Sequence, residues 1–463
     1  MEKYDVVVLG GGPGGYVAAI RASQLGKKVA IIEKDKLGGV CLNRGCIPTK
    51  ALLKSAHSVH ELKSFSRLGI NVELKSLDAA KAVKRAASVS ERIVKGVVFL
   101  MKKNNIDVLN GEGRLLSKNK MHVRLHSGEE KEIEATNFIL ATGGRYNSFP
   151  GLEHDEDRLI GAFEALRMEE LPETIGIVGA GVIGIEFAYF WNAFSVKVHI
   201  FEVQDHLLPM EDTDSSIEVE TAYRRLGIKQ SLGVKKVSTE NNGDHVILRT
   251  VEKEGDEKVY KFDKVLIAVG MKGNTEGIGL DEVGIKTNND FIVVNEYNQT
   301  NMENIYAIGD VSGPPLLAHV ASHEGMIAAE HLSGEKTRPF DKSNIPGCIY
   351  SYPQVASIGS TERELKGKNI DYSVGKVPFR VNGKAIASNE MDGFVKVLIG
   401  NDGKLLGAHI VGTLATELIH EYSLFKSMDC VDEDIFHTIH SHPTLGETLS
   451  EAIMAAKNRS LNY

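Results

Sequence analysis

The sequence of 463 residues contains only four cysteines, no concentration of basic residues and no long apolar run. Four cysteines in so long a chain cannot form the framework of disulfides that stabilises small secreted domains. Lysine and arginine total 54 against 62 acidic residues, a net charge of -8, and no stretch gathers the cations into a patch that would follow phosphates. We therefore expect no nucleic-acid partner.

The apolar runs are also too short for a membrane protein. None approaches the roughly 18 residues that a membrane-spanning helix needs. The N-terminal residues run directly into a strand-like segment, without the separate apolar region and cleavage site of a secretory signal. We therefore expect a cytoplasmic enzyme with no membrane span, and the length of the chain suggests about three or four domains.

The chain contains two copies of one pattern: a strand-like run, a glycine-rich turn, a helix-like segment, a second strand and an acidic residue. The glycines and acids are Gly10, Gly12, Gly15 and Glu33 in the first copy, and Gly179, Gly181, Gly184 and Glu202 in the second. Glycines at such a turn let the backbone approach a pyrophosphate at the positively polarised N-terminus of a helix. The acid, at the same spacing in both copies, can bind a ribose hydroxyl. Two bound dinucleotides are therefore predicted.

Glu202 indicates which pyridine nucleotide the second copy binds. An acid beside the ribose 2′-hydroxyl repels a 2′-phosphate, and residues 202–206 contain no arginine that would accommodate one. NAD is therefore favoured over NADP. The glycines alone do not decide which copy holds which dinucleotide, but a pair of cysteines follows Glu33 closely. We expect the first copy to hold the cofactor that exchanges electrons with sulfur, and a flavin fits that role.

The later part of the chain changes in character. Residues 305–310 form a strand-like run that ends in Gly-Asp. From about residue 344, the segments 393–399, 405–411 and 416–426 indicate an antiparallel sheet with flanking helices. The expected fold is therefore α/β, with two Rossmann-like dinucleotide-binding domains followed by a C-terminal α+β domain.

Cys41 and Cys46 stand five residues apart. On an ideal helix their Cα atoms would be about 8.6 Å apart, whereas a disulfide usually needs less than about 7 Å. A bond between them requires that the helix be distorted or begin between them, and Gly45 permits either. A reducible disulfide in an intracellular protein is more often catalytic than structural, although two reduced structural cysteines are the alternative. We expect the isolated Cys348 and Cys430 to be small buried apolar residues.

Residues 38–50, with their Cys-x4-Cys-Ile-Pro-Thr-Lys motif, resemble the pyridine nucleotide-disulfide oxidoreductase family, as do both glycine motifs and the tail at residues 440–447. The resemblance covers nearly the full length and is greatest to the members that oxidise dihydrolipoamide with NAD+. It implies a homodimer of four-domain chains. The implied domains are an FAD-binding domain at 1–146, an NAD-binding domain at 147–271, a central domain at 272–342 that completes the FAD site, and an interface (dimerisation) domain at 343–463.

The resemblance also implies which residues bind the two cofactors, FAD and NAD. These are Gly10, Gly12, Gly15, Glu33, Lys50, Thr142, Gly143, Asp310, Ala318, Gly179, Gly181, Gly184, Glu202 and Gly270. Asp310 is expected to hold the ribityl chain of FAD. Lys50 is expected to pair with Glu186 near the flavin, where an ammonium group can stabilise the reduced, anionic form.

His442 and Glu447 complete the expected catalytic set. A carboxylate can orient an imidazole, whose pKa suits proton exchange with a thiol near neutral pH. The resemblance implies that this histidine reaches the disulfide of the other subunit, where Cys41 exchanges with the substrate and Cys46 faces the flavin. The chain has no lipoyl domain of its own. The expected partner is therefore the lipoyl domain of a 2-oxo acid dehydrogenase complex or of a glycine cleavage carrier protein.

Two other functions remain open. A flavin disulfide reductase that resembles glutathione reductase would share the disulfide and the His-Glu pair, but usually carries arginines for the phosphate of NADPH. A non-catalytic, redox-sensing flavoprotein of the same fold would be expected to have broken motifs, whereas every expected catalytic position is filled here.

Two segments depart from the pattern of the family. Residues 270–274 differ beside the expected NAD site, and residues 350–354 differ near the start of the interface domain. We expect neither segment to touch the cysteines, the acidic residues of the motifs or His442.

Overall fold

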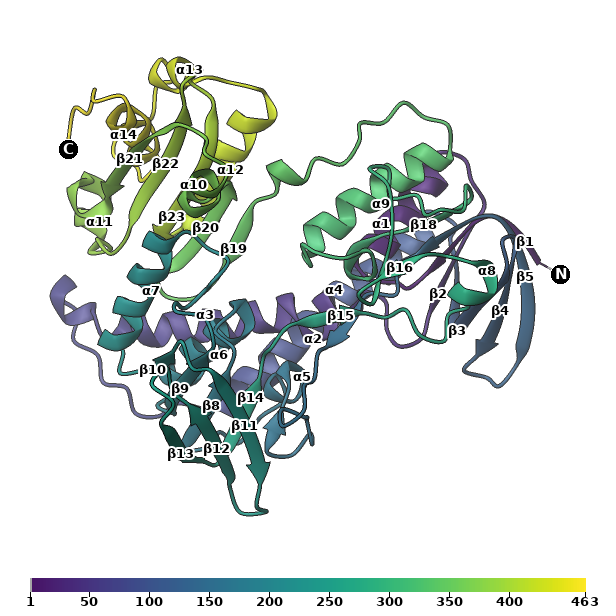
Figure 1. The fold of residues 1–463 in the computed structure, drawn as a ribbon, viewed down its shortest axis with the longest axis horizontal. Helices are drawn as coiled ribbons and strands as arrows, with labels where there is room; N and C mark the ends of the chain where they lie inside the picture. The colour runs from purple at the N-terminus through teal and green to yellow at the C-terminus, as the bar shows by residue number, and fades with distance from the viewer. Residues whose placement is uncertain (1) are drawn as a thin grey trace.

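The computed structural model describes residues 2–463, and its three largest sheets occupy separate lobes (Figure 1). A six-stranded sheet lies to the right in that view, a parallel five-stranded sheet lies below, and an antiparallel five-stranded sheet lies at the upper left. This arrangement confirms the predicted fold class. No helix among the described residues is both long and apolar enough to cross a membrane.

The first sheet is built around its N-terminal strand. Its strands are β1 (Glu2–Leu9), β2 (Val29–Glu33), β3 (Asp107–Ser117), β4 (Lys120–Leu125), β5 (Glu130–Leu140) and β18 (Ile305–Ala307). Strand β1 pairs in parallel with both β2 and β5, and residues 6–8 are fully buried. Helices α1 (Pro13–Gln24) and α9 (Ala318–Leu332) pack together beside this sheet. Such coverage explains why the second half of the strand, residues 6–9, is apolar.

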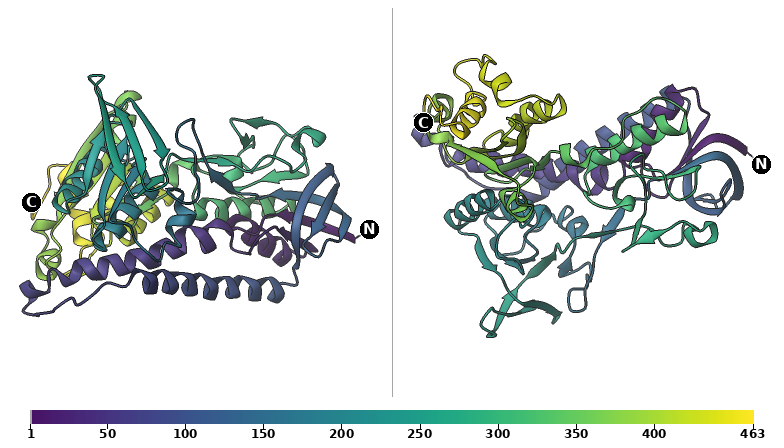
Figure 2. Two further views of the ribbon diagram at one scale, coloured as in Figure 1. Left: turned by 90° about the horizontal axis from the view of Figure 1, so that it is seen from below. Right: turned by 45° about the horizontal axis from the view of Figure 1, so that its top comes forward.

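Three helices lead from the first sheet toward the second. They are α2 (Gly39–Arg44), α3 (Cys46–Leu62) and α4 (Ala79–Lys103), with the short 3-10 helix η1 (Phe65–Leu68) before α4. Figure 2 shows α3 and α4 as long helices side by side along one face of the molecule. Because α3 also packs against α6 (Val182–Ala193), it connects the cysteine pair to the second dinucleotide-binding fold.

The second sheet is entirely parallel. Its order is β10 (Lys229–Leu232), β9 (Lys197–Glu202), β8 (Thr174–Val178), β14 (Lys264–Ile267) and β7 (Leu159–Ile160). The antiparallel strands β11 (Lys236–Asn241), β12 (Val246–Val251) and β13 (Glu257–Phe262) form a separate small sheet. Helices α5 (Ala162–Ala165), α6 and α7 (Thr213–Arg225) complete this part of the chain.

The segments that join the two dinucleotide-binding folds are short. Strands β6 (Gly144–Tyr146) and β15 (Met271–Gly273) pair with each other where the chain passes between the folds. After β15 the chain forms α8 (Leu280–Val283), β16 (Thr287–Asn288), β17 (Phe291–Ile292) and, after β18, the 3-10 helix η2 (Gly309–Ser312).

The third sheet is antiparallel throughout, as expected for the C-terminal domain. Its order is β19 (Gly347–Ile349), β20 (Gln354–Gly359), β23 (Leu405–Gly412), β22 (Phe394–Gly400) and β21 (Tyr372–Pro378). The flanking helices are η3 (Lys342–Asn344), α10 (Glu362–Gly367), η4 (Phe379–Val381), α11 (Gly383–Ser388), α12 (Ala415–Ser427), α13 (Asp432–Phe436) and α14 (Glu447–Ala456).

The two isolated cysteines are less buried than expected. Cys348 and Cys430 are both free thiols of intermediate exposure that pack against the edge of the C-terminal core. The prediction that they are buried residues is therefore only partly right, because each lies at the margin of the domain. Burial raises the pKa of Cys348 to about 11, so its thiol stays protonated at neutral pH.

Candidate active site

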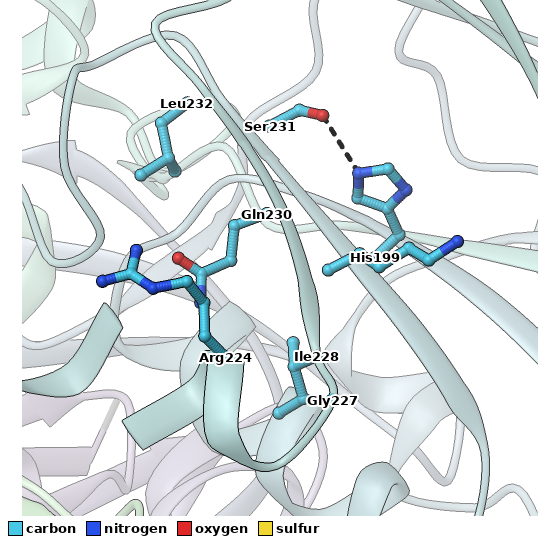
Figure 3. Close-up of a pocket in the computed structure, with 8 residues that line it drawn as sticks. His199, Arg224, Gly227, Ile228, Gln230, Ser231 and Leu232 are labelled. Carbon is cyan, nitrogen blue, oxygen red and sulfur yellow. Dashed lines mark hydrogen bonds between the residues drawn. The ribbon is translucent and has the colours of Figure 1, made fainter. Parts of the chain in front are cut away.

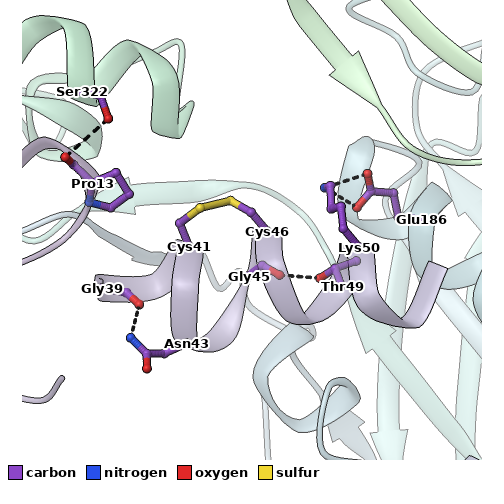
Figure 4. Close-up of a disulfide and its surroundings, with 10 residues drawn as sticks. All are labelled: Pro13, Gly39, Cys41, Asn43, Gly45, Cys46, Thr49, Lys50, Glu186 and Ser322. Atoms are coloured by element: carbon purple, nitrogen blue, oxygen red, sulfur yellow. Dashed lines mark hydrogen bonds and ion pairs between the residues drawn. A yellow bond between two sulfur atoms is a disulfide. The ribbon is translucent and has the colours of Figure 1, made fainter. Parts of the chain in front are cut away.

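Cys41 and Cys46 form a disulfide, with their Cα atoms 4.7 Å apart (Figure 4). They approach more closely than on a continuous helix because α2 ends at Arg44 and α3 begins at Cys46. Gly45 stands at the break, and a Cβ atom there would lie only 3.2 Å from the carbonyl oxygen of Val40. The break between two helices is what allows the disulfide to form.

The disulfide segment packs against the first glycine turn. The amide of Gly38 donates a hydrogen bond to the carbonyl oxygen of Gly11 at 2.7 Å. Gly39 has a positive φ of 57°, and a Cβ atom on it would lie 2.7 Å from the Cα atom of Gly12. A cofactor that follows the first turn therefore passes close to the chain that carries the two sulfurs.

The two glycine turns have the same geometry. Their first, middle and third glycines are Gly10, Gly12 and Gly15, and Gly179, Gly181 and Gly184. The first glycines have φ angles of +106° and +101°, and a Cβ atom on either third glycine would overlap the carbonyl oxygen of the first. The middle glycines are open, since a Cβ atom would meet nothing closer than 3.9 Å in the first turn and nothing within 4 Å in the second. This open cradle fits a pyrophosphate.

The two acids are held by their own turns. Glu33 accepts a hydrogen bond from the amide of Gly11 at 2.7 Å, and Glu202 accepts one from the amide of Ala180 at 2.7 Å. In each case, the other carboxylate oxygen accepts a hydrogen bond from the backbone amide two residues after the acid itself. Burial raises the pKa of Glu33, and the bond from Gly11 opposes that shift. Both carboxylates are thus fixed at the carboxyl end of a strand, where a ribose would lie.

The other residues expected at FAD lie at the same edge of the first sheet. Thr142 and Gly143 follow β5, and a Cβ atom on the next residue, Gly144, would lie 3.2 Å from the Cβ atom of Asp310. Ala318 is the first residue of α9, which packs against α1. Burial raises the pKa of Asp310 and no hydrogen bond opposes it. A partly buried carboxyl without a protein hydrogen bond fits the hydroxyl groups of a ribityl chain.

Lys50 and Glu186 form a partly buried ion pair. The Nζ atom of Lys50 lies 2.9 Å and 3.0 Å from the two carboxylate oxygens of Glu186, which is 3% exposed (Figure 4). The amide of Tyr350 donates to the same carboxylate at 3.0 Å, and the Tyr350 ring lies 4.7 Å from Nζ. Residues 350–354 thus contact Glu186, which is not one of the two motif acids, because the C-terminal domain folds back onto α6.

The other departure from the family pattern does not disturb the backbone. Residues 271–273 form the regular strand β15, and Asn274 exchanges hydrogen bonds with Thr142 through both its backbone and its side chain. Gly270 has a φ of +101° and open space around a Cβ atom. It lies at the crossing between the two dinucleotide-binding folds, where its carbonyl accepts from the amide of Asn147 at 3.0 Å.

His442 and Glu447 lie together in the C-terminal domain. Nδ1 of His442 is 2.9 Å from one carboxylate oxygen of Glu447, whose other oxygen accepts from the amide of Thr444 at 2.8 Å. Burial raises the pKa of Glu447, but the hydrogen bonds from Thr444 and His442 outweigh it, so the pKa lies below its ordinary value. The His442 side chain is 77% exposed, and Figure 1 shows α14 and α2 in different lobes. Within one chain, the histidine and the disulfide therefore belong to different lobes.

A cavity of about 650 Å³ opens at the edge of the second sheet (Figure 3). Its lining includes His199, Arg224 and residues 227–232. Half of its lining residues come from β10, the edge strand of the sheet, and the lining reaches Leu232, which pairs with Glu202 at the end of β9. We assign no part of the reaction to this cavity.

Sequence reasoning missed two residues that shape the site. The first is Gly39, whose lack of a side chain permits its close contact with Gly12. The pair of adjacent glycines before Cys41 is the sequence feature that could have indicated it. Glu324 had no signal, being one glutamate within a helix. Its carboxylate accepts from the amide of Gly309 at 2.6 Å, next to Asp310, and burial raises its pKa to about 7.

Comparison with known proteins agrees with this arrangement. Residues 4–325 match the model of the pyridine nucleotide-disulphide oxidoreductase family, and residues 345–453 match its dimerisation domain. The chain is 43% identical to the dihydrolipoyl dehydrogenase of Bacillus subtilis, covering 100% of this chain and 99% of that protein. It is 41% identical to the dihydrolipoyl dehydrogenase of Zymomonas mobilis over the whole of both chains.

A solved structure shows the same similarity in three dimensions. The crystal structure of LpdA from Mycobacterium tuberculosis superposes with a TM-score of 0.91 at 25% identity, covering 98% of this chain and 99% of that one. The matches to the family model and to its dimerisation domain together extend over most of the sequence. The chain belongs to the pyridine nucleotide-disulphide oxidoreductase family.

Proposed function

We propose that the protein is a dihydrolipoyl dehydrogenase, which oxidises the dihydrolipoyl group of a partner protein and reduces NAD+ to NADH. The observation that carries this proposal is the Cys41–Cys46 disulfide, packed against the first of two dinucleotide turns. The full-length identity to dihydrolipoyl dehydrogenases supports the choice of substrate. FAD at the first turn and NAD at the second, beside Glu202, complete the proposal.

His442 acts first in the proposed cycle. Its Nδ1 is held by Glu447, so Nε2 is the nitrogen that takes a proton from the first substrate thiol. The resulting thiolate attacks Sγ of Cys41. A mixed disulfide forms, the Cys41–Cys46 bond breaks, and Cys46 leaves as a thiolate. Because His442 and the disulfide of its own chain lie in different lobes, we assign the histidine in this step to the partner subunit of a homodimer.

The position of Cys46 favours it as the leaving sulfur. It is the first residue of the 17-residue helix α3, and the positive end of a helix stabilises a thiolate. The second substrate thiol then attacks the mixed disulfide. It releases the oxidised lipoyl disulfide, its proton passes to the departing Cys41 sulfur, and His442 retains the proton of the first thiol. FAD held at the first turn would supply the two-electron relay between the dithiol and NAD+.

We propose that the lipoyl group is carried by the lipoyl domain of a 2-oxo acid dehydrogenase complex or of a glycine cleavage carrier protein. The exposed His442 supports this proposal, because a lipoyl arm on another protein has to enter the site from solvent.

A paired assay tests the proposed function. The purified protein is given dihydrolipoamide with NAD+ or NADP+, and glutathione disulfide with NADH or NADPH. We expect rapid turnover only with dihydrolipoamide and NAD+, since Glu202 repels a 2′-phosphate. Preferred reduction of glutathione disulfide would refute the substrate assignment and leave the role of the cysteines in place.

A further inference from the structure

The carboxylate of Glu324 contacts the chain next to Asp310, the residue expected to hold the ribityl part of FAD. Glu324 lies on α9 and is 5% exposed, and its Oε2 atom accepts a hydrogen bond from the amide of Gly309 at 2.6 Å. Gly309 begins η2 and directly precedes Asp310. A buried carboxylate needs a donor, and here the donor is the backbone beside the expected FAD ligand.

Gly309 needs this contact because nothing in glycine itself enforces its conformation. Its φ angle is +69°, in the left-handed region, and glycine adopts positive and negative φ angles with similar ease. Two peptide units meet at this residue, and each is held separately. Glu324 accepts from the amide of Gly309, and the carbonyl oxygen of Gly309 accepts from the hydroxyl group of Ser312 at 2.7 Å. Together the two bonds fix the φ angle and therefore the place of Asp310.

The chain before Gly309 is fixed by the first sheet. The amide of Ile308 donates to the carbonyl oxygen of Leu140, the last residue of β5, at 3.0 Å. The sheet thus holds the chain up to Ile308, and the contact with Glu324 is the next one along the backbone. Removal of the Glu324 acceptor would free the chain at the residue where its direction changes toward Asp310.

Helix α9 is itself fixed against the first glycine turn. A Cβ atom on Gly325 would lie 2.6 Å from the carbonyl oxygen of Gly14, and the hydroxyl group of Ser322 lies 3.4 Å from the carbonyl oxygen of Pro13 (Figure 4). Pro13 and Gly14 begin α1, the helix whose N-terminus would face the pyrophosphate. One helix therefore contacts both the expected pyrophosphate site and, through Glu324, the expected ribityl site.

We propose that Glu324 is a positioning residue, which holds Gly309 so that the carboxyl group of Asp310 meets the ribityl chain of FAD. This inference rests on the proposed function in one respect, namely that FAD lies along the first turn. Without Glu324 the amide of Gly309 loses its partner, the glycine leaves the left-handed region, and Asp310 no longer has a fixed position. FAD is then held less tightly and is released faster.

The test is the rate at which the holoenzyme releases FAD, followed by the fluorescence of the free flavin. We expect release from Glu324→Leu to be about ten times faster than from the wild type, because leucine fills the space and offers no acceptor. Glu324→Gln keeps an acceptor oxygen and is expected to release FAD at close to the wild-type rate. An unchanged rate in the leucine variant, or equally fast release from the glutamine variant, would overturn the inference.

Glu330→Leu is the matched control. Glu330 lies on the same helix, and its carboxylate is 2.7 Å from the guanidinium group of Arg21 on α1. This substitution removes a contact between α9 and α1 and leaves the bond to Gly309 in place. We expect FAD release to be unchanged. Acceleration equal to that in Glu324→Leu would show a general loosening of α9 and would refute the role of Glu324.

The affinity of the oxidised holoenzyme for NAD+, measured by calorimetry, separates a local effect from a general one. We expect the same affinity in Glu324→Leu as in the wild type, since the second glycine turn lies in another lobe. A parallel loss of NAD+ affinity would count against a positioning role. If Glu324→Leu does not fold, Glu324→Asp decides, because its shorter side chain withdraws the carboxylate from Gly309. Unchanged FAD release from that variant overturns the inference.

The two proposals fail in distinguishable ways. FAD release is measured without a thiol substrate. A wild-type holoenzyme that does not oxidise dihydrolipoamide therefore refutes the proposed function, while the release rates of the variants still decide the role of Glu324. Conversely, normal dihydrolipoamide oxidation with an unchanged release rate in Glu324→Leu refutes only the role of Glu324.

Discussion

At the scale of single residues, the two sulfurs of the disulfide stand in different surroundings. Cys46 begins α3, while Cys41 lies within the short helix α2. The N-terminus of the 17-residue helix α3 favours a thiolate on Cys46, whereas Cys41 is the third residue of a helix of only six residues, where the effect is weaker. The two sulfurs should therefore not be interchangeable.

Substitution of each cysteine by serine tests this difference. In Cys41→Ser we expect loss of thiol exchange but retention of a long-wavelength absorbance, which arises when the Cys46 thiolate donates charge to the flavin. In Cys46→Ser we expect both to be lost. The measurement is the visible spectrum of each holoenzyme across neutral pH, with NADH reduction of the flavin as a control for cofactor binding. Equal spectra in the two variants would contradict the assigned roles.

The sequence predicts most of these residues, but not how they are held. The Cys-x4-Cys motif indicated a disulfide and required a helix break, which Gly45 provides. The contact of Tyr350 with Glu186 could not be predicted, because it uses a backbone amide 164 residues away. A backbone donor leaves no mark on residue type, so only the fold shows it.

At the scale of elements, the two strand-turn-helix units have the same geometry, and we propose that they bind different cofactors. Their third glycines are equivalent, since a Cβ atom on Gly15 or Gly184 would overlap the first glycine of the same turn. The turns can therefore be disabled one at a time by adding a single methyl group.

We expect Gly15→Ala to abolish flavin binding, because the first turn cannot close around a side chain. Gly184→Ala is expected to retain bound flavin and to lose reduction by NADH. Flavin absorbance after gel filtration and the rate of flavin reduction by NADH measure the two effects. Gly96→Ala, on an exposed face of α4 with open space around its Cβ position, is the control. Flavin loss from Gly184→Ala would show that the assignment of cofactors to folds is reversed.

The burial of Glu324 on α9 predicts a pH dependence of stability. Burial raises the folded pKa of Glu324 from 4.5 to about 7, so between these values the folded chain binds more protons than the unfolded chain. The free energy of unfolding should consequently decrease as the pH rises through this window, by about 3 kcal/mol in total for this group.

Glu324→Gln, which keeps an acceptor and removes the titration, isolates this contribution. Urea unfolding of both proteins at pH 5, 6, 7 and 8 is the measurement. We expect the stability of the wild type relative to the variant to fall steadily with pH and to level off above the folded pKa. A difference that is constant across this range would contradict the raised pKa.

The individual elements were predicted better than the contacts between them. The strand, turn and helix of each dinucleotide-binding fold follow from local glycine and apolar patterns. The path of residues 270–274 could not be predicted from such local patterns. Its strand β15 is held by pairing with β6, a strand more than a hundred residues earlier. A pairing of two three-residue strands has no periodic signal of its own.

At the scale of the whole molecule, a buried ion cluster connects the C-terminal domain to the second dinucleotide-binding fold. Lys396 of β22 is 1% exposed, and its Nζ atom lies 2.7 Å from Asp212, 2.8 Å from Asp214 and 2.6 Å from Glu362. The carboxylates converge on the ammonium group, which occupies the position a cation would take. A lysine within an apolar strand gave no indication of this contact, since its three partners come from distant segments.

The separation of His442 from the disulfide within one chain also belongs to this scale. The chain carries the dimerisation domain of its family, and each proposed active site combines the cysteines of one subunit with the histidine of the other. A chain with Cys41→Ser and a chain with His442→Ala should each form inactive homodimers. In a mixed dimer, one site receives both substitutions and the other receives neither.

Co-expression of the two inactive chains should therefore restore dihydrolipoamide oxidation. Random pairing makes half of the dimers mixed, each with one intact site out of two, so we expect about a quarter of the wild-type activity. Isolation of the mixed dimer through two different affinity tags should raise the value to about half. If both residues acted within one chain, each site of the mixed dimer would carry one substitution, and no activity would return. Restoration thus depends on the symmetry of the assembly, which no single chain can show.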